Sequence, residues 1–424
     1  MIPLFKVSPS PSWNFRLALA CFVAVSVSLP IAWISLSKVV LFITGLIYAT
    51  KNLAQGETSE VGSTAIWTNK YILFIVFLFG VSLLWTSADS ASALHTLVKH
   101  SKILDIVLLV YLIRSATDAR RVVGVFLTAQ VAVLIISWFV AAGMPFPWGA
   151  FNANTAGTRY VIFAESYIDQ SLMFCVLAAV AWHIDPPILN SRWIAGAIAL
   201  AALGNVFFLL PGRTGYVVGI AVISLTVMWA APRQHRVWVV MGVPLLLLSA
   251  LYLANEQSHQ RLQQLVTETH QYSEQQEMLS SSGWRLNAWR RSLQAIKEQP
   301  AIGYGVGGWA LAAKSFEGSN ADAIFGSGNN SNPHQEFLLW GVELGVGGSL
   351  LLLGLLLCMA RDAMAFPPPA RKCMHSILAV VGIACLFNSA LYDDLIGDYL
   401  CVAMGILYAY GIRHCALSRR THTG

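Results

Sequence analysis

The sequence predicts an all-α integral membrane protein that crosses the bilayer about twelve times. Only 11% of the 424 residues are charged, 56% are hydrophobic, and the mean hydropathy is +0.61. A water-soluble fold cannot bury that much apolar surface. The apolar residues also occur in runs of about 17 to 25, the length that a helix needs to cross roughly 30 Å of hydrocarbon. We therefore expect lipid to surround most of the chain.

The apolar runs define the individual spans. The first run follows the basic residues Lys6 and Arg16 and has no small-residue cleavage site, so we expect a retained anchor and not a signal peptide. The predicted transmembrane helices occupy residues 14–33, 36–53, 70–86, 96–114, 121–142, 168–183, 193–210, 214–231, 236–254, 335–360, 374–391 and 397–413.

Lysine and arginine indicate how the spans are oriented. Sixteen of the 27 basic residues fall on the side of the N-terminus, and five fall in short loops or helix ends on the other side. Because basic residues in short loops are retained in the cytoplasm, this bias predicts that both termini are cytoplasmic. The net charge of +6 follows from the same bias and indicates anionic membrane lipids, not nucleic acid, as the surface partner.

One long external segment divides the chain into three parts. Residues 1–254 hold predicted helices 1 to 9, residues 255–334 form the large external loop, and residues 335–424 hold helices 10 to 12 and a cytoplasmic tail. The loop begins with a Gln- and Glu-rich stretch that is typical of a solvated helix. It later contains the glycine-rich run GYGVGGW, which predicts either a turn or a hinge that lets the backbone approach a ligand.

Three arginines lie on a second helix predicted in this loop, from Trp284 to Lys297. At about 100° per residue, Arg285 cannot share a face with Arg290 and Arg291. A guanidinium suits a phosphate because its planar fork donates two parallel hydrogen bonds. Part of the trio could bind one anionic ligand, and a solvated basic face is the alternative. The residues expected to face the membrane domain are Trp284, Ala288, Leu293 and Ile296.

Two further residues lie where external turns meet apolar helices. Arg213, in LLPGRTGYVVG, is placed in a short turn at the outer surface of the bilayer, where a charge is costly to desolvate. His334, in NNSNPHQEFLL, precedes a membrane span, and an unperturbed pKa of about 6.5 lets histidine exchange a proton near neutrality. Glu336 and Glu343 could orient its ring or face solvent. A snorkelling arginine and a helix-capping histidine are the structural alternatives.

Acidic residues gather at the external turn between the last two spans. Asp393, Asp394 and Asp398 could bind a divalent cation, orient His334 and the arginines, or remain hydrated. No CxxC or Cys/His spacing indicates a metal site, and we expect no metal or other cofactor.

Two other histidines, His95 and His100, are also predicted to be external. Their only neighbours that suit a phosphate are Lys99 and Lys102. We therefore rank both histidines below His334 as candidates for chemistry.

Three segments together resemble a known family. The run SGWRLNAWRRSLQAIKEQPAIGYGVGGW, followed by NPHQEFLLWGVELGVGGSLLLLGLL, resembles the shared core of the O-antigen ligase and polymerase superfamily. The PGRTGYVVG turn is similar to that family's upstream arginine turn. The resemblance covers about residues 210–360 by motif and the whole chain by topology. It implies a GT-C-like membrane glycosyltransferase, active at the periplasmic face of the bacterial inner membrane, that uses neither a metal nor a nucleotide sugar.

The ligase member of this family implies a specific reaction. It transfers O-antigen polysaccharide from undecaprenyl diphosphate to lipid A-core during lipopolysaccharide biosynthesis. The family's essential arginines and histidine correspond to Arg213, Arg285 and His334, with the arginines on the leaving diphosphate and the histidine as general base in an inverting displacement. Weaker candidates for contacts to the diphosphate or the sugar are Arg290, Arg291, Asp393 and Asp394.

Three other functions stay open from the sequence. An O-antigen polymerase and a protein O-oligosaccharyltransferase belong to the same superfamily. A transporter of lipid-linked oligosaccharides is a different class, and transporters usually show repeated halves with charges near the bilayer midplane. Here the candidate residues gather on one face of the predicted membrane domain, which favours an enzyme.

Overall fold

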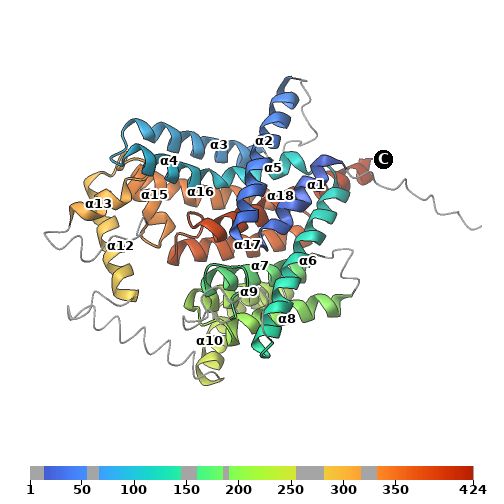
Figure 1. Ribbon diagram of the computed structural model, residues 1–424. Coiled ribbons are helices and arrows are strands. Elements are labelled where there is room, and N and C mark those ends of the chain that lie inside the picture. The colour runs from blue at the N-terminus through green and yellow to red at the C-terminus, as the bar shows by residue number, and fades with distance from the viewer. Residues whose placement is uncertain are drawn as a thin grey trace, which may run out of the picture.

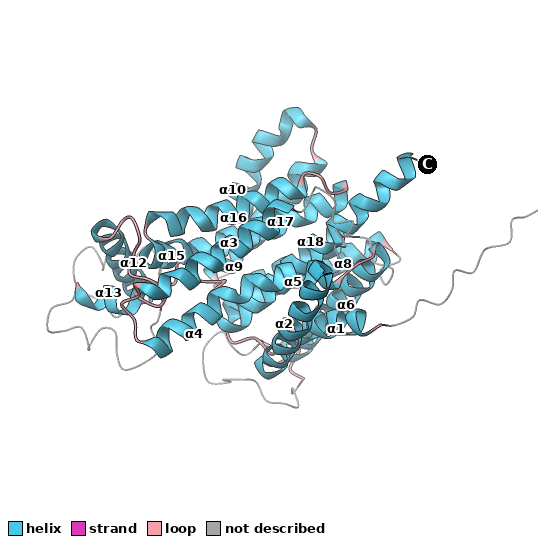
Figure 2. Cartoon of the chain, turned by 90° about the horizontal axis from the view of Figure 1, so that it is seen from above, coloured by secondary structure: helices cyan, strands magenta, loops and turns pink. Residues whose placement is uncertain are grey.

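The computed structural model describes residues 14–54, 66–144, 160–184, 191–254, 281–316 and 332–423. These residues form helices and turns, with no strand among them, as an all-α protein requires. The helices pack into one bundle. Helices α12 (Ser281–Glu298) and α13 (Trp309–Ser315) lie at one end of it, and the last turns of α18 (Asp394–Thr423) lie at the other (Figure 1, Figure 2).

The remaining helices make up the body of the bundle. Before the long external loop they are α1 (Phe15–Ser26), α2 (Ile31–Ala54), α3 (Ile66–Val81), α4 (Ser90–His100), α5 (Leu104–Leu112), α6 (Ala116–Ala141), α7 (Tyr167–His183), α8 (Arg192–Phe208), α9 (Arg213–Ala230) and α10 (Arg236–Ala254). After it they are α15 (Glu336–Leu344), α16 (Val346–Ala363) and α17 (Pro368–Phe387).

Several of these helices suit a bilayer. In the described part of the chain, six are long and apolar enough to cross a membrane, and three shorter ones are also apolar. Large apolar side chains cover the outside of the bundle, including Phe77 on α3, 64% exposed, and Trp193 on α8, 89% exposed. Such a surface is stable only in lipid or against another protein. The chain is therefore a multi-pass membrane protein.

Twelve spans, and cytoplasmic placement of both termini, remain predictions. The six long apolar helices are Trp67–Leu84, Ala116–Ala141, Arg213–Ala230, Val346–Ala363, Pro368–Phe387 and Asp394–Cys415, and the shorter ones are Phe15–Ser26, Ile31–Ile47 and Arg192–Phe208. The solvated helix predicted at the start of the large loop lies outside the described residues.

The span predicted at 335–360 is interrupted by Gly345. This residue has φ of +69°, in the left-handed region that favours glycine, and it separates α15 from α16. A Cβ atom there would collide with the backbone of Pro300 and Ala301. The N–H of Val346 donates to the carbonyl of Pro300 at 2.9 Å. The helix is therefore broken where the segment at Pro300 and Ala301 packs against it.

Two other predicted spans have different limits. Helix α1 ends at Ser26 and α2 begins at Ile31, directly after Pro30, because proline disfavours helical geometry in the residue before it. A 3₁₀ turn at Ser101–Ile103 separates α4 from α5 within the span predicted at 96–114. Both breaks shorten the continuous helix available to cross the membrane.

The glycine-rich segment predicted as a turn or a hinge is a packed turn. Gly303, Gly305 and Gly307 have φ of +65°, +78° and +80°. The N–H of Gly305 donates to the carbonyl of Glu343, and the N–H of Gly307 donates to its carboxylate, both at 2.9 Å. The other oxygen of this buried carboxylate is 2.6 Å from His100 Nε2. Glu343 thus fastens the turn to α4 and α15.

The predicted helix at 284–297 is confirmed as α12, with one side chain placed wrongly. Ala288 is buried, and Trp284 and Ile296 pack against the core of the bundle, as predicted. Leu293 instead is 52% exposed. Helical periodicity identifies the apolar stripe but not where the contact with the bundle stops.

We expect Gly303→Ala to destabilise the protein by roughly 2 to 4 kcal/mol. An alanine would adopt a left-handed conformation, and its Cβ would lie 2.5 Å from Val342 O and from Gly345 N. Thermal unfolding in detergent measures the effect. The control is Gly347→Ala on α16, where a Cβ would meet nothing within 4 Å. Equal unfolding temperatures for the two variants would contradict the packed turn.

Candidate active site

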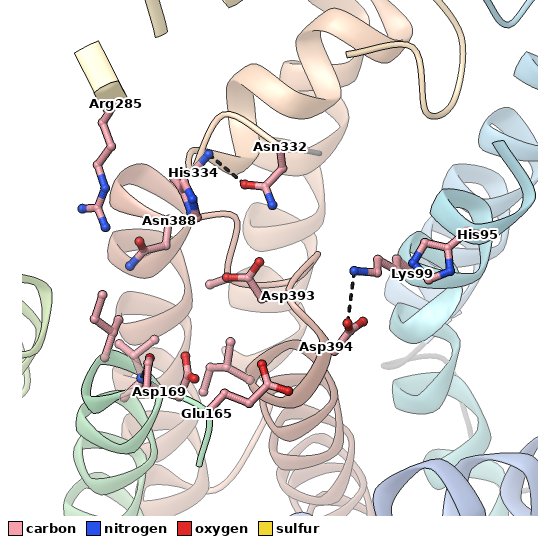
Figure 3. A pocket seen from close by; sticks show the side chains of 15 residues that line it. His95, Lys99, Glu165, Asp169, Arg285, Asn332, His334, Asn388, Asp393 and Asp394 are labelled. Atoms are coloured by element: carbon pink, nitrogen blue, oxygen red, sulfur yellow. Dashed lines mark hydrogen bonds and ion pairs between the residues drawn. The ribbon is translucent and has the colours of Figure 1, made fainter. Parts of the chain in front are cut away.

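A cavity of about 570 Å³ lies at the end of the bundle that carries α12. Its walls come from α4, the start of α7, α12, the segment before α15, and the turn between α17 and α18. Figure 3 shows ten polar side chains around this space. They are His95, Lys99, Glu165, Asp169, Arg285, Asn332, His334, Asn388, Asp393 and Asp394.

His334 has a strained backbone that its neighbours hold in place. Its φ of +49° is unusual for a residue with a side chain and costs about 1 kcal/mol or more. The N–H of His334 donates to Asn332 Oδ1 at 2.8 Å (Figure 3). The indole N–H of Trp289 donates to the carbonyl of Pro333 at 3.1 Å. The N–H of the next residue, Gln335, donates to a hydroxyl on the α17–α18 turn. These bonds hold the backbone from which the imidazole projects.

The electrostatic surroundings keep His334 neutral. Burial lowers its pKa to about 4, and the positive charge of Arg285 acts in the same direction. The ring also meets the edge of Trp284, with 5.2 Å between centroids. At neutral pH the imidazole therefore has one nitrogen able to accept a proton.

Arg285 separates from the other two arginines of α12, as the helical period predicts. Its side chain extends from α12 toward His334 and Asn388 (Figure 3). Arg290 is exposed on another face of the helix. Arg291 donates from Nη1 to the carbonyl of Ala313 at 3.0 Å and so holds α13 against α12. Of the three, Arg285 lines the cavity.

Arg213 begins α9 next to one wall of the cavity without lining it. The turn before it spans residues 209–212, which is short, as predicted. A Cβ at Gly212 would lie 3.3 Å from Tyr167, and one at Gly215 would lie 2.6 Å from Ser171. The first turns of α9 and α7 are therefore in close contact. The side chains of α7 that line the cavity also belong to these first turns of the helix.

The acidic residues of the α17–α18 turn are balanced by lysines. Asp394 forms ion pairs with Lys99 at 3.2 Å and Lys102 at 3.5 Å, and Asp398 pairs with Lys38 at 2.8 Å. Asp393 lies at the centre of the cavity in Figure 3. Burial raises its pKa to about 6, although two lysines oppose that shift. No group of three or more His, Cys, Asp and Glu side chains suited to a metal occurs in the described residues.

Glu336 and Glu343 are both buried, so the alternative in which they face solvent is wrong. The carboxylate of Glu336 accepts hydrogen bonds from the indole N–H of Trp340 and from the N–H groups of Leu391 and Tyr392, at 2.9, 3.0 and 3.2 Å. It therefore ties the start of α15 to the turn that carries Asp393. Its bonds place this turn beside His334 and do not orient the imidazole ring directly.

Several cavity residues carried no clear signal in the sequence. His95 and Lys99 come from α4, far from the other candidates along the chain; the sequence ranked His95 below His334 and gave Lys99 only as its basic neighbour. Glu165 and Asp169 flank the start of α7 and were not singled out. Asn332 is two residues before His334, and its place in the NNSNPH run was the only indication in the sequence that it lies near the site.

We expect Arg291→Ala to lower the stability of the protein by about 1 to 3 kcal/mol, because two hydrogen bonds from a charged group, to Ala313 O and Asn287 Oδ1, are lost. Arg290→Ala on the same helix should change it by less than about 0.5 kcal/mol. Unfolding midpoints of the two purified variants measure the difference. A larger loss in Arg290→Ala would contradict the assigned roles.

The family model described as O-antigen ligase matches residues 197–353 of the chain. This segment runs from α8 into α16 and contains Arg213, Arg285 and His334. The chain matches no curated protein. The family suggests a glycosyltransferase-type activity, as a ligase or a polymerase, on polysaccharide and lipid-linked substrates. Residues 197–353 of the chain are thus similar to the O-antigen ligase family, in agreement with the resemblance of the sequence motifs.

Proposed function

We propose that this protein is an O-antigen ligase, which transfers O-antigen polysaccharide from undecaprenyl diphosphate to lipid A-core at the periplasmic face of the inner membrane. The observation that carries this proposal is that Arg285 and His334 line one polar cavity. A cation and a neutral base side by side are what glycosyl transfer from a diphosphate requires.

The arginine meets the main electrostatic demand of the reaction. Negative charge develops on the diphosphate as the bond to the anomeric carbon breaks, and a positioned guanidinium stabilises it. Arg285 would bind the diphosphate from α12. Arg213, at the start of α9 beside the α7 wall, would approach it from the other side. Together they would supply the charge that Mg²⁺ supplies in many other glycosyltransferases.

His334 would act as the general base. Its lowered pKa leaves the imidazole neutral, so it can accept the proton of the acceptor hydroxyl as that oxygen attacks the anomeric carbon. The diphosphate leaves from the opposite face, which gives inversion in a single displacement. The constrained backbone of His334 supports this role, because an ordered base reduces the entropy cost of reaching the transition state.

The cavity also offers a surface for the lipid tail of the donor. Ile168 and Leu172 on α7 and Ile396 on α18 are apolar lining residues. They lie near the ends of helices whose bodies continue into the membrane domain. An isoprenoid chain attached to a diphosphate at Arg285 could follow this apolar side toward the bilayer.

We expect His334→Ala and Arg285→Ala each to lower the transfer rate at least about 100-fold. Arg285→Lys should restore little, because lysine lacks the planar two-donor fork. Arg290→Ala is the matched control on α12 and should retain near-normal activity. The assay uses purified protein in nanodiscs with an undecaprenyl-diphosphate-linked glycan and lipid A-core.

The products of the same assay separate the possible functions. A ligase joins the glycan to lipid A-core, whereas a polymerase lengthens the lipid-linked glycan without that acceptor. Full transfer to lipid A-core by folded His334→Ala would refute the proposed base.

The pH dependence of transfer follows from the pKa of His334. Its folded-state pKa is lowered to about 4, so the imidazole is neutral above that pH and becomes protonated as the pH falls through it. We therefore expect kcat/KM to fall as the pH decreases through about 4, and not already as it decreases through about 6.5. Asp393, with a pKa of about 6, also titrates in this cavity, and Asp393→Asn removes its contribution. An acid limb near pH 6.5 that persists in Asp393→Asn would contradict this account.

A further inference from the structure

A second cavity, of about 290 Å³, lies at the opposite end of α7 and α17 from the candidate active site. These two helices pack side by side (Figure 1). Asp169 in the first turn of α7 and Asn388 directly after α17 line the first cavity. His183, the last residue of α7, and Pro368, the first of α17, line the second. Helices of 17 and 20 residues separate the two by about 25 to 30 Å, which is close to the thickness of the hydrocarbon core.

The charged groups of this second cavity all favour an anion. Arg192 from α8 and Lys372 from α17 are basic, and none of the described residues that line the cavity is acidic. Among the described residues, no Asp or Glu forms an ion pair with either of them. This differs from the first cavity, where Lys99 is paired with an aspartate.

His183 adds a buried polar atom that lacks a partner. Its Nε2 atom is buried and has no hydrogen-bond partner in the described structure, although its ring packs edge-on against Trp229. A buried polar atom without a partner costs about 1 to 3 kcal/mol, so such atoms usually face a ligand or water. Protonated at Nε2, the ring would donate to an anion held by Arg192 and Lys372.

The surroundings indicate a membrane interface. The N-termini of α8 and α17 both begin at this cavity, and the positive ends of helix dipoles favour phosphate. Trp182, which is 53% exposed, lines the cavity, and exposed Trp193 follows Arg192. Tryptophan is typical of the level of lipid headgroups.

We propose that the cavity lined by His183, Arg192 and Lys372 binds the phosphate group of an anionic ligand at the membrane face opposite the candidate active site. A phospholipid headgroup and free phosphate share this chemistry. Basic pockets between membrane helices are known binding sites for anionic headgroups, and the aromatic wall suits a lipid. The inference does not depend on glycan transfer at the first cavity.

The test measures ligand binding to the delipidated full chain. Native mass spectrometry follows titration with dioleoyl-phosphatidylglycerol, with zwitterionic phosphatidylcholine as the comparison lipid. Thermal unfolding with and without inorganic phosphate forms the second arm. The cavity variant is Arg192→Gln/Lys372→Gln. The matched control is Arg233→Gln/Arg371→Gln, which removes two cations from the same end of the bundle outside the cavity.

We expect the cavity variant to bind phosphatidylglycerol at least about tenfold more weakly than the wild type, while the control variant stays within about twofold. If phosphatidylglycerol binding is unchanged but stabilisation by phosphate is lost in the cavity variant alone, the site takes free phosphate. Equal responses of both variants in both arms would overturn the proposal. Should the double variant fail to purify as a monodisperse species, Lys372→Gln with Arg371→Gln as its control gives the same comparison.

Discussion

The buried carboxylate of Glu336 is the contact on which the geometry of the candidate active site depends. A carboxylate taken out of water is stable only when hydrogen-bond donors surround it, and here one indole and two backbone N–H groups do so. Two of those donors belong to the turn between α17 and α18, and the acceptor lies two residues after His334. The hydrogen bonds of Glu336 therefore hold the acidic turn beside the segment that carries His334. A second buried carboxylate, Glu343, holds the glycine-rich turn in a similar way.

Charge is arranged differently at the two ends of the helix bundle. On the α4 side of the first cavity, Lys99 and Lys102 pair with Asp394, and Arg285 lines the cavity from α12. Among the described residues, the lining of the second cavity has two cations and no acid. The helices α7 and α17 reach from one cavity to the other, so both ends of the bundle present a polar site at the level where lipid headgroups lie.

The sequence predicted the helices better than their interruptions. Apolar runs located most helices, but Gly345 and Ser101–Ile103 break helices because of tertiary contacts that no local pattern records. The separation of Arg285 from Arg290 followed from the helical period alone. The meeting of Arg285 with His334 was expected only through the family resemblance, since long-range proximity has no signature in one sequence. His95 was ranked below His334 for the same reason, and Leu293 was misplaced because periodicity does not reveal where packing ends.

The central claim, that the cavity at Arg285 and His334 holds the donor diphosphate, is tested most directly by an electron cryo-microscopy structure of the protein in nanodiscs with undecaprenyl diphosphate. The account predicts phosphate density within about 3 Å of the Arg285 guanidinium, beside His334, with the isoprenoid along Ile168 and Leu172. Diphosphate density that lies outside this cavity, for example between Arg192 and Lys372, would contradict it.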